Sequence, residues 1–266
     1  MSIPIALTIA GSDSSGGAGI QADLKTFAAS GVYGASVITA LTAQNTRGVT
    51  AIHPVPADFV TAQIDAVFGD LDVRAVKIGM VAQREVIEAI AAGLTRWAPK
   101  HVVLDPVMVA TSGDRLLAPD AVEALRAQLI PRAGIITPNL PEAAALLGEA
   151  VAVSENDIAG QGKRLLALGC AHVLIKGGHG QGAESTDYLI SAERVIVLAS
   201  PRIATQNTHG TGCSLSSAIA AELAKGKDLE AAVRSAKAYI SAAIAAADRL
   251  DVGHGHGPVH HFHGFY

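Results

Sequence analysis

Aromatic residues, cysteines and charges are all scarce in this sequence, and each shortage excludes a class of protein. Aromatic residues make up 4% of the chain and charged residues 17%, while half of all residues are hydrophobic. That balance excludes a disordered chain, which needs high charge and little apolar surface. Two cysteines in 266 residues cannot supply the disulfide framework of a small secreted domain. The sequence therefore indicates a folded protein with a core of small aliphatic side chains.

Long apolar runs and a basic leader are absent as well. The longest small-residue stretch never reaches the ~18 apolar residues of a membrane span. Residues 1–10 lack the positive start of a secretory signal. We therefore expect a cytoplasmic protein that does not enter a membrane. The charges that interrupt the stretch are Arg234, Lys237, Asp248 and Arg249.

Neither sign of charge dominates the chain. Twenty-four acidic residues against twenty basic ones give a formal net charge of −4. Such a protein has no overall positive field for a polyanion, so nucleic acid is a poor partner. Binding of a small anionic ligand is still compatible with this charge, because the backbone N–H groups of one loop can bind phosphate whatever the net charge of the protein.

Short apolar runs alternate with helical stretches along the whole chain. We predict strands at residues 3–10, 36–39, 75–78, 101–104, 134–136 and 172–175, and an edge pair at 188–190 and 194–198. We predict helices at residues 18–29, 57–68, 83–97, 119–129, 141–147, 157–168, 214–225 and 229–250. The alternation predicts an α/β fold in one domain, 1–266, with a mostly parallel central sheet flanked by helices on both faces.

Polar residues follow several of these strands directly, and ligands of such sheets bind beyond the carboxyl ends of the strands. Asp105, Asn139, Glu142 and Lys176 would converge there and suit phosphate and Mg²⁺. Asn139 or Asp105 taken singly could equally cap the next element. The loops concerned are Gly11-Ser12-Asp13, Asp105-Pro106, Thr137-Pro138-Asn139 and Lys176-Gly177-Gly178.

The glycine-rich segment 11–19 does not have the features of a dinucleotide loop. Residues 17–22 fit the pattern G-x-G-x-x-A, but the segment runs past the strand end and no acid follows at 36–41. A phosphate loop ending in G-K-[ST] is missing too. A glycine loop that leads into a helix remains, with Asp13 and Asp23 nearby; a tight surface turn is the alternative.

The segment Thr208-His209-Gly210-Thr211-Gly212-Cys213 precedes a long small-residue helix. Free N–H groups at such a helix start form a pocket for negative charge. Cys213 would lie in the first turn, where the helix dipole lowers the pKa of a thiol, and its thiolate could take a proton from an alcohol. A buried cysteine that fills a gap is the alternative, and we expect this role for Cys170.

Five histidines crowd the last thirteen residues and raise the question of a metal site. Their spacing fits no zinc site with cysteines, so a solvated or docked terminal segment is the favoured interpretation. They are His254, His256, His260, His261 and His263.

Taken together, these motifs resemble the ribokinase-like superfamily and, within it, the bacterial hydroxymethylpyrimidine/phosphomethylpyrimidine kinases. The resemblance covers essentially the whole chain, through residues 10–20, 39–46, 77–80, 104–108, 137–142, 175–179, 207–213 and 253–258. It implies a three-layer α/β/α fold and two successive ATP-dependent phosphorylations of 4-amino-5-hydroxymethyl-2-methylpyrimidine in thiamine biosynthesis. It also implies Mg²⁺, leaves room for a monovalent cation, and suggests a homodimer acting on a small molecule.

The resemblance further implies roles for individual residues. Cys213 takes the place of the catalytic base, and the anion hole falls on Gly210, Thr211 and Gly212. Gln44 would hydrogen-bond the aminopyrimidine edge, since an amide offers both donor and acceptor. Its companions in the substrate pocket would be Gly11, Ala18, Asp23, Met80 and Val107. The nucleotide would lie beside Asn139, Lys176, Thr208 and Lys237, and the metal beside Asp105 and Glu142.

Two other functions stay open at this point. Pyridoxal or pyridoxine kinase is the first. Its substrate, like hydroxymethylpyrimidine, is a planar heteroaromatic ring with a hydroxymethyl group, and a cysteine base occurs in the pyrimidine-kinase branch and in its pyridoxal-kinase relatives. A non-catalytic binding protein is the second. It would need a lost base or anion hole, whereas residues 210–213 retain both.

Overall fold

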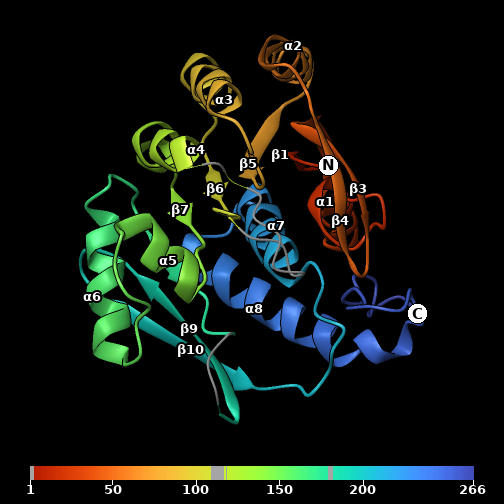
Figure 1. Cartoon of the computed structure of the whole chain (residues 1–266), viewed down its shortest axis with the longest axis vertical. Helices are drawn as coiled ribbons and strands as arrows, with labels where there is room; N and C mark the ends of the chain where they lie inside the picture. Colours follow the sequence, from red (N-terminus) through yellow and green to blue (C-terminus); the bar gives the residue numbers. More distant parts are fainter. Residues whose placement is uncertain (1–2, 109–116, 118, 179–181) are drawn as a thin grey trace.

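The computed structural model describes residues 3–108, 117, 119–178 and 182–266, and its centre is one eight-stranded sheet (Figure 1). Its strands are β1 (Ile5–Ala10), β2 (Tyr33–Ile38), β5 (Val73–Ile78), β6 (Val102–Leu104), β7 (Ile135–Ile136), β8 (Val173–Ile175), β9 (Glu184–Ile190) and β10 (Val195–Pro201). They lie in the order β10-β9-β8-β7-β6-β5-β1-β2. Strands β8 to β2 are parallel, and β9 and β10 form the predicted pair at one edge, where each runs antiparallel to its neighbours.

Helices cover both faces of this sheet, which confirms the predicted three layers. They are α1 (Gly19–Ala29), α2 (Ala57–Phe68), α3 (Arg84–Trp97), α4 (Pro119–Ala124), α5 (Leu140–Leu147), α6 (Glu155–Leu166), α7 (Thr211–Ala224) and α8 (Leu229–Ala245). One buried cluster joins the sheet to α2 through α6, and a second joins its other face to α1, α7 and α8. None of the helices in the described parts of the chain has the length and apolarity to cross a bilayer.

Strand residues alternate between the two clusters, as the two-residue period of a strand requires. Leu7 and Ile9 of β1 join the first cluster, whereas Ala6 joins the second. In β5, Val76 and Ile78 face the first cluster and Ala75 the second. The small residues lie on the side of α7 and α8, whose many alanines let these helices approach the sheet closely.

The structure departs from the prediction in three parts of the chain. Residues 40–54 form a separate antiparallel hairpin, β3 (Ala40–Asn45) and β4 (Gly48–Pro54), which was not predicted because its small and polar residues give little strand signal. The helix predicted at 119–129 turns π-helical at Leu125–Leu129, just before Pro131. The last helix ends at Ala245 and continues as a single 3-10 turn, Ala247–Arg249.

Candidate active site

Loops from the carboxyl ends of β1, β5, β6, β7 and β8 converge on the start of α7, as predicted for this type of sheet. Figure 1 shows α7 running across the centre of the molecule toward these loops. The substrate-side loop 11–19 comes from β1, and the nucleotide-side residues follow β6, β7 and β8. The start of α7 lies between them.

Gly210 is the residue from which α7 begins. Its φ of +79° lies in the left-handed region, and a Cβ there would clash with the carbonyl oxygen of Gly17. Thr211 closes the turn, because its Oγ1 donates to the carbonyl of Thr208 at 2.7 Å. No acidic residue lies in the first turn and no side chain caps the helix. This end of α7 therefore presents a positive dipole end, which suits the predicted anion hole.

Cys213 lies half-buried in the first turn of α7, and the N–H of Gly19 is directed at its sulfur. Burial raises the pKa of this thiol to about 11, and the carboxylates of Asp23 and Asp105 add to the rise. Lys77 and the Gly19 N–H oppose it without cancelling it. The pKa of Cys213 is thus raised rather than lowered as predicted, and burial is the largest influence on it.

Cys170 fulfils the prediction of a core cysteine. It is buried, its sulfur lies 3.6 Å from the carbonyl oxygen of Leu165, and burial raises its pKa to about 11. Cys213 is the more accessible of the two thiols.

Asp105 and Lys176 form a buried ion pair on the nucleotide side. Lys176 Nζ lies 2.8 Å from Asp105 Oδ1 and 3.9 Å from Glu142 Oε2. Hydroxyls of Thr137 and Ser216 also donate to the Asp105 carboxylate. Although burial alone would raise the Asp105 pKa, these partners hold it below its usual value. Among the residues that the structure describes, Asp105 is therefore the acceptor of an ion pair and caps no helix.

Glu142 and Asn139 do form an ordinary cap, the alternative that the sequence left open for Asn139. Asn139 Oδ1 accepts from the Glu142 N–H at 2.8 Å, and Glu142 Oε2 accepts from the Asn139 N–H at 2.8 Å. Burial raises the Glu142 pKa to about 7, with Lys176 opposing and Asp105 adding to the rise. The cap also holds Glu142 beside Lys176.

The donor set of Asp105 and Glu142 fits Mg²⁺. Both offer carboxylate oxygens, and Mg²⁺ is commonly held by one or two carboxylates together with substrate phosphates. The described residues contain no group of three or more histidine, cysteine and acidic side chains that could hold a metal by itself. A Cβ on Gly212 would lie 3.1 Å from Lys176 Nζ and 3.7 Å from Asp105 Oδ2, so this cluster adjoins the helix end.

Two of the predicted substrate residues, Gly11 and Met80, are in contact, and a third, Gln44, is joined to the loop of residues 11–19. The methyl end of Met80 lies against the Cα of Gly11, where any side chain would clash with it. Gln44 comes from β3, where its N–H donates to Ser14 Oγ at 2.9 Å and its Oε1 accepts from Thr42. The unpredicted hairpin therefore brings Gln44 to the loop that follows β1. Ala18 and Val107 are half-buried.

Asp23, also expected in the substrate pocket, lies beneath it. Its side chain is fully buried, and Lys77 Nζ lies 2.8 Å from each carboxylate oxygen. Thr8 and Ser217 donate to the same oxygens. With both oxygens taken by internal donors, Asp23 offers no free acceptor to a substrate.

Asp13 and His209 join the two glycine loops, a contact that sequence reasoning missed. Asp13 Oδ2 lies 2.7 Å from His209 Nε2 and also accepts from the N–H groups of Gly17 and Ala18. Burial would raise the pKa of Asp13, but the hydrogen bonds from His209, Ser15 and Ala18 hold it at about 2. The only sequence signal was the place of each residue within a glycine motif.

Lys237 and Thr208 flank the nucleotide side. Lys237 Nζ lies 2.7 Å from Asp187 Oδ2, while Asp187 Oδ1 accepts from the Gly177 N–H at 2.9 Å. Lys237 thus supports the loop that carries Lys176. His179, the last residue of that motif, lies outside the described residues.

The histidine-rich tail is docked on the protein. His261 is buried and its Nε2 lies 2.9 Å from Ser214 Oγ, while the N–H of His256 donates to the carbonyl of Thr46 in the β3–β4 turn. His209 is held by the tail as well, since its N–H donates to the Gly257 carbonyl. The tail therefore fastens the hairpin and the start of α7, which confirms docking; Figure 1 shows it beside the hairpin end.

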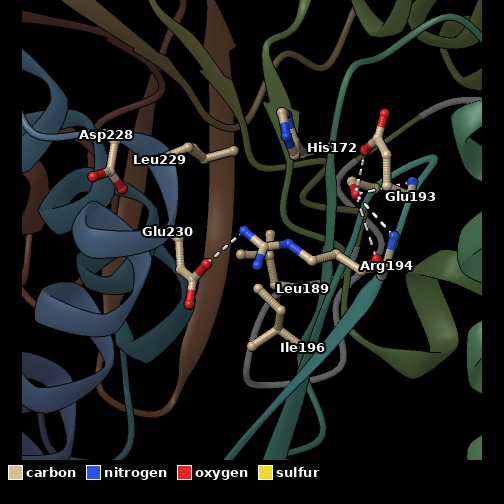
Figure 2. Close-up of a pocket in the computed structure, with 9 residues that line it drawn as sticks. His172, Leu189, Glu193, Arg194, Ile196, Asp228, Leu229 and Glu230 are labelled. Carbon is tan, nitrogen blue, oxygen red and sulfur yellow. Dashed lines mark hydrogen bonds and ion pairs between the residues drawn. The ribbon is translucent and has the colours of Figure 1, made fainter.

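A pocket of about 400 Å³ lies where β8 begins, at the other end of this strand from Lys176. The ion pair of Arg194 and Glu230 crosses the pocket (Figure 2). No predicted site residue lines it. It is formed by the residue before β8, the β9–β10 turn and the start of α8: His172, Leu189, Ser191, Glu193, Arg194, Ile196, Asp228, Leu229 and Glu230.

Comparison with known proteins gives consistent similarities. A family model described as phosphomethylpyrimidine kinase matches residues 13–260. The hydroxymethylpyrimidine/phosphomethylpyrimidine kinase of Rhizobium meliloti is 62% identical over 97% of both chains. A thiamine biosynthesis bifunctional protein of Geobacter sulfurreducens is 52% identical over 96% of this chain and 51% of its own length. The ADP complex of Bacillus subtilis pyridoxal kinase superposes with a TM-score of 0.91, at 40% identity and 98% coverage of both chains.

Proposed function

We propose, from the premise that this chain belongs to the phosphomethylpyrimidine kinase family, that it phosphorylates hydroxymethylpyrimidine twice at the expense of ATP, in thiamine biosynthesis. One observation carries the proposal: the uncapped start of α7, which carries Cys213, adjoins the loop of residues 11–19 at Gly210 and the Lys176–Asp105 pair at Gly212. A base and an anion hole placed between two binding regions suit transfer between two bound molecules.

In the first step the hydroxymethyl oxygen attacks the γ-phosphorus of ATP. Its O–H bond breaks and the proton passes to Sγ of Cys213, which acts in its thiolate form and becomes the neutral thiol, while the bond between the γ-phosphorus and ADP breaks. The N–H groups at Gly210, Thr211 and Gly212 and the Lys176 ammonium stabilise charge on the transferring group. Asp105 and Glu142 would hold Mg²⁺, which neutralises phosphate charge when bound.

In the second step a phosphate oxygen of the monophosphate is the nucleophile. It is already anionic at neutral pH, so it needs no base, and the same anion hole serves the transferring group. Asn139, Thr208 and Lys237 would line the nucleotide, while Gly11, Ala18, Met80 and Val107 would line the ring beside Gln44. Asp23 is assigned an indirect role beneath the pocket.

Pyridoxal phosphorylation is the second candidate, favoured by the likeness to the Bacillus subtilis pyridoxal kinase structure. Steady-state kcat/KM for hydroxymethylpyrimidine and for pyridoxal, measured with one preparation, decides between them. The proposal expects the pyrimidine to be preferred by tenfold or more, about 1.4 kcal/mol in transition-state binding. A preference for pyridoxal would overturn it.

We further propose a single-domain homodimer that works in the cytoplasm. Tyr33 on the edge strand β2 is 54% exposed, and Phe59 on the adjoining α2 is 60% exposed. Such exposed aromatic side chains suit a surface that a second copy of the chain covers. Sedimentation velocity should give a mass of twice 27.1 kDa, and a monomer at micromolar concentration would contradict this. Varying Mg²⁺ and K⁺ in the kinetic assay tests the two cation requirements.

A further inference from the structure

The strap, residues 253–261 of the histidine-rich tail, joins the turn of the β3–β4 hairpin to the start of α7. Its first part lies on Thr46 in that turn. The Gly255 N–H donates to Thr46 Oγ1 at 3.1 Å, and the His256 N–H donates to the Thr46 carbonyl at 2.9 Å. Because Thr46 follows Gln44 by two residues, this end of the strap holds the part of the hairpin that would recognise the ring.

Three alternate glycines fit the strap to its partners. A Cβ on Gly253 or Gly255 would clash with Thr46. A Cβ on Gly257 would clash with the side-chain oxygen of Asn207. Gly253 also has a φ of +75°, in the left-handed region that favours glycine. The alternation of glycine and histidine in the tail therefore provides close backbone contact with the hairpin and with the segment before α7.

The second part of the strap is buried and fixes the start of α7. The His209 N–H donates to the Gly257 carbonyl at 3.0 Å. His261 Nε2 lies 2.9 Å from Ser214 Oγ, which in turn donates to the Gly210 carbonyl at 2.8 Å. An imidazole N–H that donates to this hydroxyl satisfies all three groups. His261 is thereby linked through one hydroxyl to the first residue of the proposed anion hole.

Stability of the core does not explain the first part of the strap. Residues 253–256 are exposed and consist of glycine and histidine, so they bury no large apolar side chain. The hairpin that they hold is similarly open, since every residue of β4 is exposed or half-buried. A two-stranded hairpin is at best marginally stable by itself in water, so its position depends on such anchors. The strap is thus a tie between two parts of the site.

We propose that the strap sets the position of the hairpin relative to the anion hole, and that Thr46, Gly255 and His261 are positioning residues for transfer to the hydroxymethyl group. This inference rests on the proposed function, in which Gln44 binds the ring and Gly210 begins the anion hole. The hairpin end of the strap governs binding of the ring, and the α7 end governs the rate of transfer. Misplacing reacting groups by about 1 Å can cost about 100-fold in rate, so small shifts at either end are measurable.

Calorimetric binding tests the hairpin end without any phosphoryl transfer. In Gly255→Ala the new Cβ would clash with the Thr46 carbonyl, so the dissociation constant for hydroxymethylpyrimidine should rise about tenfold, as for one lost hydrogen bond. The dissociation constant for ADP should change less than about twofold, because the nucleotide-side residues follow β6, β7 and β8. Gly264→Ala is the matched control from the same tail, where a Cβ would meet none of the described atoms within 4 Å.

The two ligands separate positioning from a general loosening of the fold. Equal weakening of both ligands in Gly255→Ala would overturn the inference, as would an unchanged affinity for the pyrimidine. If Gly255→Ala fails to fold, Thr46→Val keeps the shape of the side chain and removes the hydroxyl acceptor. It should weaken ring binding about threefold, and no weakening in this variant would equally overturn the inference.

The rate of transfer tests the α7 end. His261→Ala removes the donor to Ser214, so kcat of both phosphorylations should fall about tenfold while the dissociation constant for the ring stays unchanged. His261→Gln, whose amide nitrogen can donate to the same hydroxyl, should recover most of the rate. Equal losses in the alanine and glutamine variants would contradict the role of His261.

Failure of this inference is distinguishable from failure of the proposed function. An unaltered chain that neither binds nor phosphorylates hydroxymethylpyrimidine would remove both together. Unchanged affinities and rates in the variants of an active chain would overturn the role of the strap alone.

Discussion

Asp13 and His209 stand 196 residues apart in sequence and meet through a 2.7 Å contact between Asp13 Oδ2 and His209 Nε2. Asp13 belongs to the loop after β1, and His209 directly precedes the start of α7. Because the same carboxylate also accepts from Gly17 and Ala18, it fixes the substrate-side loop and the anion hole as one unit. Both halves of the site therefore depend on this pair for their relative position.

The pair predicts a pH-dependent contribution to stability. The Asp13 pKa of about 2 lies below the ordinary 3.8, so its stabilisation is complete above pH 4 and is lost as the pH falls through about 2. Asp13→Asn should lower the free energy of unfolding at pH 6 by about 2 kcal/mol. At pH 3 the difference in free energy of unfolding between the variant and the unchanged protein should be smaller. Urea unfolding at both pH values measures it, with the exposed Asp70→Asn as control. A constant gap would contradict the assignment.

Cys213→Ala should separate the two phosphorylations. Loss of a general base costs about 10²- to 10⁴-fold, so the rate on the alcohol should fall by that factor. The rate on the monophosphate should stay within about fivefold, because its phosphate oxygen needs no base. Each step is assayed separately by ADP release, with Cys170→Ala as the matched cysteine control. Equal losses in the two steps would remove Cys213 from the role of base.

Gly210 and Gly212 should respond differently to alanine. Gly210→Ala forces a left-handed residue to carry a Cβ against the Gly17 carbonyl, so the fold should lose about 2 kcal/mol or more. In Gly212→Ala the new Cβ would lie 3.1 Å from Lys176 Nζ, which has to shift only slightly, so the fold should keep its stability while both phosphorylations fall about 10²-fold or more. Thermal unfolding and kcat/KM of the two variants measure this. Full activity in Gly212→Ala would show that the helix end does not hold the transferring group.

Local patterns were enough to predict most of the fold. The helix at Ala57–Phe68 was predicted to the residue because Pro56 marks its start and its sequence is strongly helical. The hairpin β3–β4 was missed, since neither strand has a clear apolar alternation and its turn lacks Asn-Gly. Without that hairpin the sequence could not show how Gln44 reaches the loop of Ser14.

The candidate site was predictable as a set of loops but not in its electrostatics. The sequence indicates that Cys213 opens a helix, yet its pKa depends on burial and on Asp23 and Asp105, which come from distant elements. Asp23 itself was expected to meet the substrate, because a motif does not show that Lys77 from another strand lies against it. Such pairings arise from the register of β1 and β5 and from helix packing, which local sequence does not encode.

Phosphorus NMR of ATP, hydroxymethylpyrimidine and the purified chain tests the central claim most directly. The account predicts that a monophosphate resonance appears first and then gives way to a diphosphate, with one ADP formed for each transfer. ATP left intact, or a monophosphate that accumulates without any diphosphate while ATP remains, would contradict it.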